Sequence, residues 1–297
     1  MKDAAWYESQ YRNRLAVPDH PRIFAQWEAA SQSARRTPGF QADVRYGDHG
    51  MQTVDVYPAQ GECRAGLLFL HGGYWMALDK REHGFVALEL IRHGVTVFVA
   101  NYALCPTVTI DVIVRQVLES GAWLYRNAAD FGVPRGRLYI SGHSAGGHLT
   151  AMALAADWRQ VASDLPSQVF SAGLAISGIY DLCDLVNVPS VNAKVRLDLE
   201  TARRVSPMSM RPATDAPLYL AVGGDELPPF RRQHQELGAA WKNVVAQSEV
   251  LPGENHYSIL LQLVDPASRL FHAMATMMRL QRGAANPPNA EGASPSA

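Results

Sequence analysis

A short run of small residues between an apolar stretch and a helix-like stretch constrains this chain most. The apolar stretch is residues 137–140, and it leads into Gly142 and Gly146, which flank Ser144 at one residue's distance on each side. A run of small residues, 149–156, follows with helical character. A turn this sharp strains the backbone at the serine, and side chains at the two glycines would collide with neighbouring backbone. The pattern predicts a strand, a tight turn that lifts the Ser144 hydroxyl clear, and a helix.

The same alternation of apolar runs and helix-like runs extends over most of the chain. Strands are expected at 44–46, 53–57, 65–70, 95–100, 137–140, 172–176, 217–222 and 248–251. Helices are expected at about 81–93, 110–130, 149–156 and 231–242, with a long final helix after residue 256. Alternation of this kind predicts an α/β fold, in which a mostly parallel eight-stranded sheet carries helices on both faces. The first two strands alternate polar and apolar residues, as an antiparallel edge does.

The sequence predicts one main domain with smaller additions. Residues 1–39 carry aromatic residues among charges and should form a helical flap, broken near Pro18 and Pro21, that packs on the domain or shapes a pocket entrance. Residues 40–282 should form the α/β domain. Within it, the irregular, proline-containing stretch 181–212 is expected to be a small cap or lid. The tail 283–297 is rich in Ala, Pro, Gly, Asn and Ser and is expected to be disordered.

Composition excludes several classes of function. The 297 residues carry a net charge of −1, which argues against partners such as nucleic acid or an anionic membrane surface. The three cysteines, Cys63, Cys105 and Cys183, show neither metal-ligand spacing nor a disulfide framework, which favours a reducing compartment. The first ten residues are too polar for a secretory leader, and no apolar run reaches the length of about 18 residues that a membrane span needs. A cytoplasmic protein is expected, and a homodimer is compatible with the sequence.

Two side chains further along could activate Ser144. In an open α/β sheet, sites form at the carboxyl ends of the strands. Asp225 directly follows strand 217–222, and His256 follows strand 248–251. We therefore expect Ser144 to attack an acyl carbon, His256 to take its proton, and Asp225 to fix the tautomer of the imidazole.

The assignment of the acid has alternatives, because other residues offer the same chemistry. Glu226 and Asp215 are rival acids, and Gly-Gly-Asp is also good turn chemistry, so Asp225 is compatible with a purely structural role.

His71-Gly72-Gly73 follows strand 65–70 and is the second strong signal. Its glycines let the backbone approach a substrate, so the N–H groups of Gly72 and Gly73 are expected to join that of Ala145 in an oxyanion hole. His71 itself is expected to be structural rather than a proton carrier.

Candidate pocket residues stand beside these motifs. Tyr74 and Trp75 could wall a pocket or belong to the core, and Tyr102 is a weaker candidate at the end of the next strand. His143 flanks the serine, as does His148, and packing with hydrogen bonding is the favoured role for both. Tyr257 follows His256 and completes the set. No phosphate-binding or dinucleotide-binding loop is visible, so no cofactor is expected, and no metal site is indicated.

With these residues in place, the chain resembles the α/β-hydrolase superfamily over about residues 40–280. Within it, the motifs look like those of the kynurenine formamidase (arylformamidase) branch, near the hormone-sensitive-lipase-like esterases. The motifs are residues 71–75, 142–149, 223–226 and 255–257. The resemblance implies a cofactor-free Ser144–Asp225–His256 hydrolase with an oxyanion loop at residues 72–73. Its substrate would be an N-formyl anilide or a small aryl or acyl ester. Two alternatives stay open: a general carboxylesterase, and a non-catalytic homologue that binds a small molecule.

Overall fold

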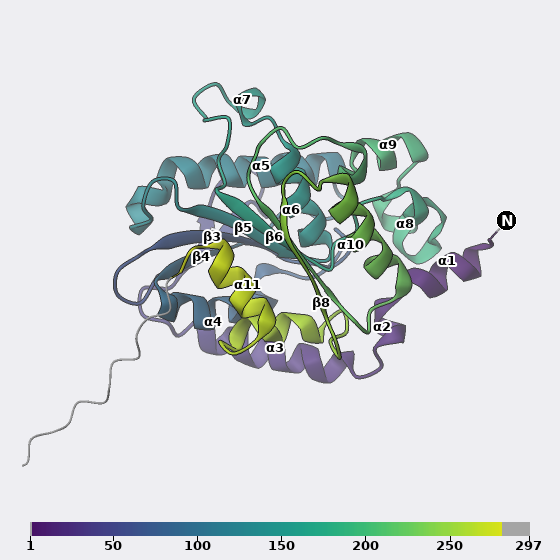
Figure 1. Cartoon of the computed structure of the whole chain (residues 1–297), viewed down its shortest axis with the longest axis horizontal. Coiled ribbons are helices and arrows are strands. Elements are labelled where there is room, and N and C mark those ends of the chain that lie inside the picture. Colours follow the sequence, from purple (N-terminus) through teal and green to yellow (C-terminus); the bar gives the residue numbers. More distant parts are fainter. Residues whose placement is uncertain (1, 281–297) are drawn as a thin grey trace, which may run out of the picture.

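The computed structural model describes residues 2–280, so the expected disordered tail lies outside the described residues. Its centre is an eight-stranded sheet with the strand order β1-β2-β4-β3-β5-β6-β7-β8 (Figure 1). The strands are β1 (Gln41–Arg45), β2 (Thr53–Tyr57), β3 (Ala65–Leu70), β4 (Val95–Ala100), β5 (Leu138–His143), β6 (Ala172–Ile176), β7 (Leu218–Gly223) and β8 (Val245–Leu251). Only the pairings β1–β2 and β2–β4 are antiparallel. The predicted mostly parallel sheet with an antiparallel edge is confirmed.

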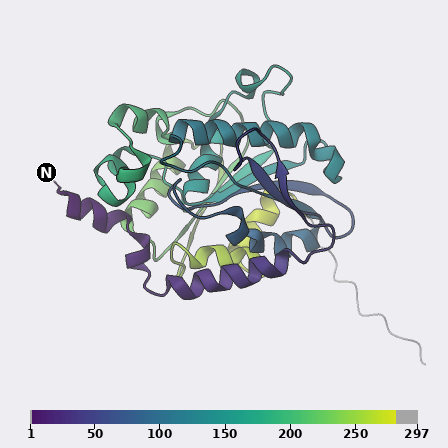
Figure 2. The same cartoon turned by 180° about the vertical axis from the view of Figure 1, so that it is seen from behind.

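Helices cover both faces of this sheet (Figures 1 and 2). Helices α5, α6 and α10 lie on one face, and α3, α4 and α11 lie on the other. The α-helices are α1 (Ala4–Tyr11), α2 (Asn13–Ala16), α3 (His20–Ala34), α4 (Ala87–Leu90), α5 (Ile110–Asn127), α6 (Ala145–Ala155), α7 (Trp158–Val161), α8 (Pro189–Val195), α9 (Leu199–Arg204), α10 (Pro228–Ala240) and α11 (Arg269–Met277). Within residues 2–280, no helix combines the length and the apolar character that a membrane span requires.

The apolar strands are buried on both sides, and this gives the molecule two cores. Along β3, Leu68 and Leu70 point into the core under α5 and α6, whereas Leu67 and Phe69 point into the core under α3 and α11. Successive side chains of a strand face opposite sides, so a continuous apolar run is what a central parallel strand needs. The sheet is thereby held from both faces, and its carboxyl edge is a rigid base for the loops that follow it.

Two helical predictions need correction. The helix expected at 81–93 is a series of single turns, in which α4 is flanked by short 3₁₀ segments. The expected long final helix is a 3₁₀ segment, Ser258–Val264, followed by α11, because Pro266 lies between them and has no N–H for a continuous helix. The break expected near Pro18 and Pro21 is present, because α2 ends at Ala16 and α3 begins at His20; Pro21 lies in the first turn of α3, where proline is well tolerated.

The N-terminal segment and the stretch 181–212 meet at one end of the molecule, where α1 lies beside α8 (Figures 1 and 2). The Glu8 carboxylate accepts hydrogen bonds from the backbone N–H and the hydroxyl of Ser190, at 2.5 and 2.8 Å. The Tyr11 hydroxyl donates to Asp184 at 3.0 Å. These polar contacts join two segments that are far apart in the sequence, beside the carboxyl edge of the sheet.

Candidate active site

Ser144 lies at the sharp turn between β5 and α6. Its backbone dihedrals are φ 56° and ψ −116°, a region that residues other than glycine rarely adopt. A side chain at Gly146 would bring its Cβ within 2.0 Å of the Leu70 carbonyl oxygen, and one at Gly142 would come within 2.3 Å of the Gly146 oxygen. The two glycines therefore let β3, β5 and α6 approach closely, as the sequence predicted, and the strained turn fixes the direction of the Ser144 hydroxyl.

A chain of hydrogen bonds runs from this hydroxyl into the protein. The Ser144 Oγ lies 3.0 Å from His256 Nε2, and His256 Nδ1 donates to Glu226 Oε2 at 2.6 Å. Glu226 also accepts from the Gly223 N–H at 2.8 Å and from the Ser177 hydroxyl. Ser144, His256 and Glu226 are each at most 4% exposed. A serine next to an imidazole whose far nitrogen is held by a carboxylate is the arrangement that makes an alcohol nucleophilic.

The assignment of Asp225 as the acid partner of His256 is wrong. The turn after β7 exposes the Asp225 side chain to solvent and brings Glu226 back under the sheet edge. The turn is fixed by backbone hydrogen bonds, because the Asp225 N–H donates to the Glu254 carbonyl at 3.0 Å. The other rival, Asp215, is also exposed. Adjacent residues of a turn point in different directions, so Glu226 occupies the inward position.

Three backbone N–H groups stand beside the serine. Those of Gly72, Gly73 and Ala145 donate to no protein acceptor within residues 2–280. Gly72 lies against the turn, because a Cβ at this residue would be 3.2 Å from the Ser144 Cβ. Gly73 has φ 111°, and a Cβ there would collide with the Ala77 carbonyl at 2.0 Å. Free donors next to a nucleophile are what an oxyanion hole requires.

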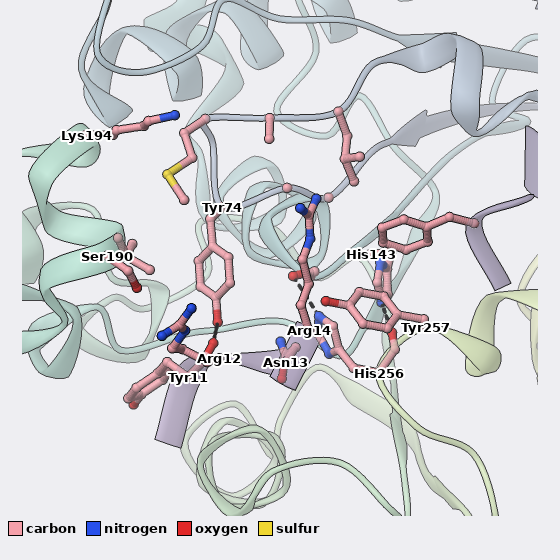
Figure 3. Close-up of a pocket in the computed structure, with 18 of the residues that line it drawn as sticks. Tyr11, Arg12, Asn13, Arg14, Tyr74, His143, Ser190, Lys194, His256 and Tyr257 are labelled. Carbon is pink, nitrogen blue, oxygen red and sulfur yellow. Dashed lines mark hydrogen bonds between the residues drawn. The ribbon is translucent and has the colours of Figure 1, made fainter. Parts of the chain in front are cut away.

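A cavity of about 350 Å³ opens above Ser144 (Figure 3). Five residues of the Phe, Trp and Tyr types line it, and they are Tyr11, Phe24, Trp27, Tyr74 and Tyr257. His143 lines it as well, so three of the five predicted pocket residues face the cavity. A volume of this size is at the small end of the range for ligand pockets.

The other two pocket predictions, Trp75 and Tyr102, are wrong. Both side chains are fully buried, and neither lines the cavity. Trp75 Nε1 donates to His148 Nδ1 at 3.2 Å, and the Tyr102 hydroxyl donates to the His71 carbonyl at 2.7 Å. Both side chains thus hold the loop that follows β3 from below.

Comparison of the sequence with known proteins identifies the family of this chain. A profile described as the alpha/beta hydrolase fold matches residues 67–259. The chain is 32% identical to a kynurenine formamidase of Salmo salar, over 91% of this chain and 93% of that protein. It is 33% identical to a kynurenine formamidase of Danio rerio, over 86% and 88%. This chain belongs to the α/β-hydrolase family.

Solved structures agree with the family. A crystal structure of a provisionally assigned thioesterase from Silicibacter sp. TM1040 matches with a TM-score of 0.81 and 28% identity, covering 90% of this chain and 98% of that one. The fold class is therefore confirmed, and the protein is a hydrolase.

Three buried histidines support the site of this hydrolase without taking part in the hydrogen-bonded chain. His143 Nε2 donates to the His256 carbonyl at 2.7 Å, so it holds the loop that carries the imidazole. His148 Nε2 donates to the Val205 carbonyl at 2.7 Å, which ties α6 to the stretch 181–212. The His71 ring is stacked on Tyr102, with ring centres 4.4 Å apart. These contacts agree with the structural roles expected from the sequence.

Burial keeps these histidines neutral. It lowers the pKa of His71 and of His148 to about 4, and that of His83, a fourth buried histidine next to His71, to about 3. Burial, with the nearby His256, also lowers the pKa of His143 well below its usual value. At neutral pH their N–H groups are therefore fixed donors in single tautomers, which suits a positioning role.

The buried histidines predict how the stability of the hydrolase depends on pH. Their folded-state pKa values are lower than the unfolded value of about 6.5, so the unfolded chain binds more protons below that pH. Stability should therefore be full above about pH 6.5 and fall as the pH drops toward 4. Each such histidine contributes a slope of up to about 1.4 kcal/mol per pH unit. Urea unfolding at pH 7.5 and pH 5.0 measures this, and equal free energies of unfolding at the two pH values would contradict it.

Sequence reasoning missed the contribution of the N-terminal segment to the cavity wall. Tyr11, Arg12, Asn13 and Arg14 all line the cavity. The Tyr74 hydroxyl donates to the Tyr11 carbonyl at 2.6 Å, so the loop after β3 holds this segment in place (Figure 3). The prediction that residues 1–39 shape a pocket entrance named no individual residues. A break between two short helices has no repeating hydrophobic pattern that would show which side chains face the cavity.

Proposed function

We propose that this hydrolase removes an N-formyl group from an aryl amine, with Ser144 as nucleophile, His256 as general base and Glu226 as the acid that orients it. The hydrogen-bonded chain of these three side chains, opening on a cavity with aromatic walls, carries the proposal. The kynurenine formamidases of salmon and zebrafish support the formyl amide as substrate.

The reaction would proceed through two acyl transfers. Ser144 Oγ attacks the formyl carbon while its proton passes to His256 Nε2, and the carbonyl oxygen becomes an oxyanion next to the N–H groups of Gly72, Gly73 and Ala145. The imidazolium, balanced by the Glu226 carboxylate, then gives its proton to the leaving nitrogen, and the C–N bond breaks. Water attacks the formyl ester by the same route, and formate and free Ser144 result.

The shape of the cavity fits a small acyl group on an aryl leaving group. Phe24, Trp27 and Tyr257 form one aromatic cluster, in which the ring centres of Phe24 and Trp27 are 5.0 Å apart and those of Phe24 and Tyr257 are 4.9 Å apart. Aromatic rings pack favourably on such walls at offset or edge-on geometry. A formyl group is the smallest acyl group and leaves most of the cavity to the leaving group.

A substrate comparison tests the proposal. We expect kcat/KM on N-formylkynurenine to be at least about tenfold higher than on p-nitrophenyl acetate, because the aromatic walls bind the aryl ketone as well as the scissile amide. The measurement is steady-state kinetics on N-formylkynurenine, p-nitrophenyl acetate and p-nitrophenyl butyrate. Faster hydrolysis of butyrate with no detectable release of formate would overturn the formamidase proposal.

That same outcome would support a second candidate function, a carboxylesterase or thioesterase without formamidase activity. The thioesterase assignment of the Silicibacter structure favours this candidate, since that structure matches nearly the whole chain. Both functions use the same nucleophile and differ only in the acyl group and the leaving group that the cavity accepts.

A further inference from the structure

The cavity above Ser144 is lined by three positively charged side chains and by no Asp or Glu. Arg12 joins α1 to α2, Arg14 comes from α2, and Lys194 comes from α8 (Figure 3). Arg12 Nε lies 3.8 Å from Glu8, whereas Arg14 and Lys194 form no ion pair with another residue in the range 2–280. The net charge of the chain is −1, so this concentration of positive charge is local to the cavity.

Arg14 lines the cavity from α2, and its side chain is exposed to solvent. Its side chain extends between Tyr74 and Tyr257 in Figure 3. The guanidinium carbon lies 5.6 Å from the centre of the Phe24 ring, within the distance at which a cation is attracted to an aromatic face. The nearby Glu82 carboxylate does not pair with Arg14, because it accepts the Asp79 N–H at 2.8 Å. The guanidinium thus lies against the Phe24 ring and near the Tyr257 hydroxyl, and no carboxylate within residues 2–280 pairs with it.

Asn13, the neighbour of Arg14, supplies an independent observation. Its side chain is 3% exposed and lines the cavity, yet neither its amide nitrogen nor its amide oxygen has a hydrogen-bond partner in residues 2–280. Buried polar atoms in proteins are nearly always hydrogen-bonded. An amide with both groups unpaired, on the wall of a cavity, indicates that a ligand completes its hydrogen bonds.

We propose that Arg14 and Asn13 form a recognition site for a carboxylate on the substrate, away from the bond that Ser144 attacks. The planar guanidinium and the adjacent amide N–H₂ offer several donors, which is the geometry that carboxylates bind best. Arg12 and Lys194 add positive charge at the cavity mouth, which attracts an anionic substrate. This inference rests on the proposed function only in taking the Ser144 cavity as the substrate site, and it makes Arg14 and Asn13 specificity-determining residues.

Two matched aryl acetates test the site. 3-(4-Acetoxyphenyl)propanoate carries a remote carboxylate, and 3-(4-acetoxyphenyl)propanamide has the same shape without the charge. We expect the wild-type protein to favour the carboxylate by about 10- to 100-fold in kcat/KM, as a charge-assisted hydrogen bond allows. Arg14→Gln should bring this ratio close to 1. Arg36→Gln removes the same charge from an exposed residue outside the cavity and should retain the wild-type ratio.

Binding to the Ser144→Ala protein separates this inference from the proposed function. We expect calorimetry to give the same preference for the carboxylate probe in dissociation constants, and Arg14→Gln in this background to remove it. Preferential binding without turnover by the wild-type protein would support the carboxylate site and contradict the proposed hydrolysis. Turnover of both probes with equal kcat/KM, or an unchanged ratio in Arg14→Gln, would overturn the carboxylate site alone.

Asn13→Leu distinguishes a binding role of the amide from a structural one. Leucine has a similar volume and introduces no unpaired polar atoms, so the melting temperature should stay the same or rise. The Kd for the carboxylate probe should nevertheless increase by about tenfold, as loss of one such hydrogen bond implies. An unchanged Kd would remove Asn13 from the site, and a clearly lower melting temperature would indicate that the amide is structural.

Discussion

Glu226→Gln is expected to lower kcat by about 10⁴-fold, whereas Asp225→Asn should stay within about threefold of the wild-type protein. The reason lies in the tautomer of His256. A carboxylate at residue 226 accepts the Nδ1 proton and leaves Nε2 free to take the proton of Ser144. A glutamine amide can donate to Nδ1, and this favours the tautomer whose protonated Nε2 cannot act as a base.

Asp225→Asn is the matched control for Glu226→Gln. Both replace a carboxylate with the matching amide at neighbouring residues, but only Glu226 is buried against His256. The measurement is kcat on p-nitrophenyl acetate, a substrate that the formamidase and the esterase hypotheses share. Severe loss in Asp225→Asn together with high activity in Glu226→Gln would restore the acid that the sequence suggested and would contradict the geometry.

Ser144→Ala is expected to have the largest effect, a loss of about 10⁶-fold in kcat, because the side chains of such a triad act as a unit. His256→Ala should lose a similar factor, and the double substitution should be little worse than either single one. A fluorophosphonate probe should label Ser144 alone in the wild-type protein, as peptide mass spectrometry would locate. Ser33→Ala, at an exposed residue of α3, should keep wild-type activity and labelling.

This experiment also decides whether the protein is catalytic. If native protein fails to react with the probe, or if Ser144→Ala is labelled equally, the activated serine does not exist. The protein would then bind a small molecule without turning it over, which is the second of the two alternatives that the sequence left open.

The sequence predicted those parts of the site that depend on backbone geometry. Gly142, Ser144 and Gly146 form a turn that only small residues allow, so their spacing alone indicates the strand–turn–helix. His256 could be placed because a loop after a parallel strand ends at one known edge of the sheet. These features follow from local steric limits and from the topology of the fold.

Choices between adjacent residues could not be made from the sequence. Asp225 and Glu226 have the same chemistry and differ only in which side of a turn they face, and that direction depends on the backbone hydrogen bond to Glu254. Trp75 and Tyr74 are a similar pair, since one points into the core and the other toward the cavity. Both have positive φ, 56° and 51°, a conformation that no helix or strand periodicity describes.

Residues 11–14 also escaped prediction, for a different reason. Their contribution depends on contacts between segments distant in sequence, such as the hydrogen bond from Tyr74 to the Tyr11 carbonyl. No local pattern encodes a contact across more than sixty residues, and the unpaired amide of Asn13 becomes visible only once its surroundings are known.

The wall formed by the N-terminal segment and α8 has a consequence for how this enzyme could diversify. Ser144, His256 and Glu226 are anchored at strand ends, but the wall proposed to select the substrate comes from two short helical segments at the periphery, which hydrogen bonds from Ser190 to Glu8 join. Mutational libraries restricted to residues 11–14 and 190–194 should therefore vary substrate preference and leave the catalytic residues unchanged. Substitutions in these two segments would change substrate specificity while every intermediate variant keeps its catalytic residues.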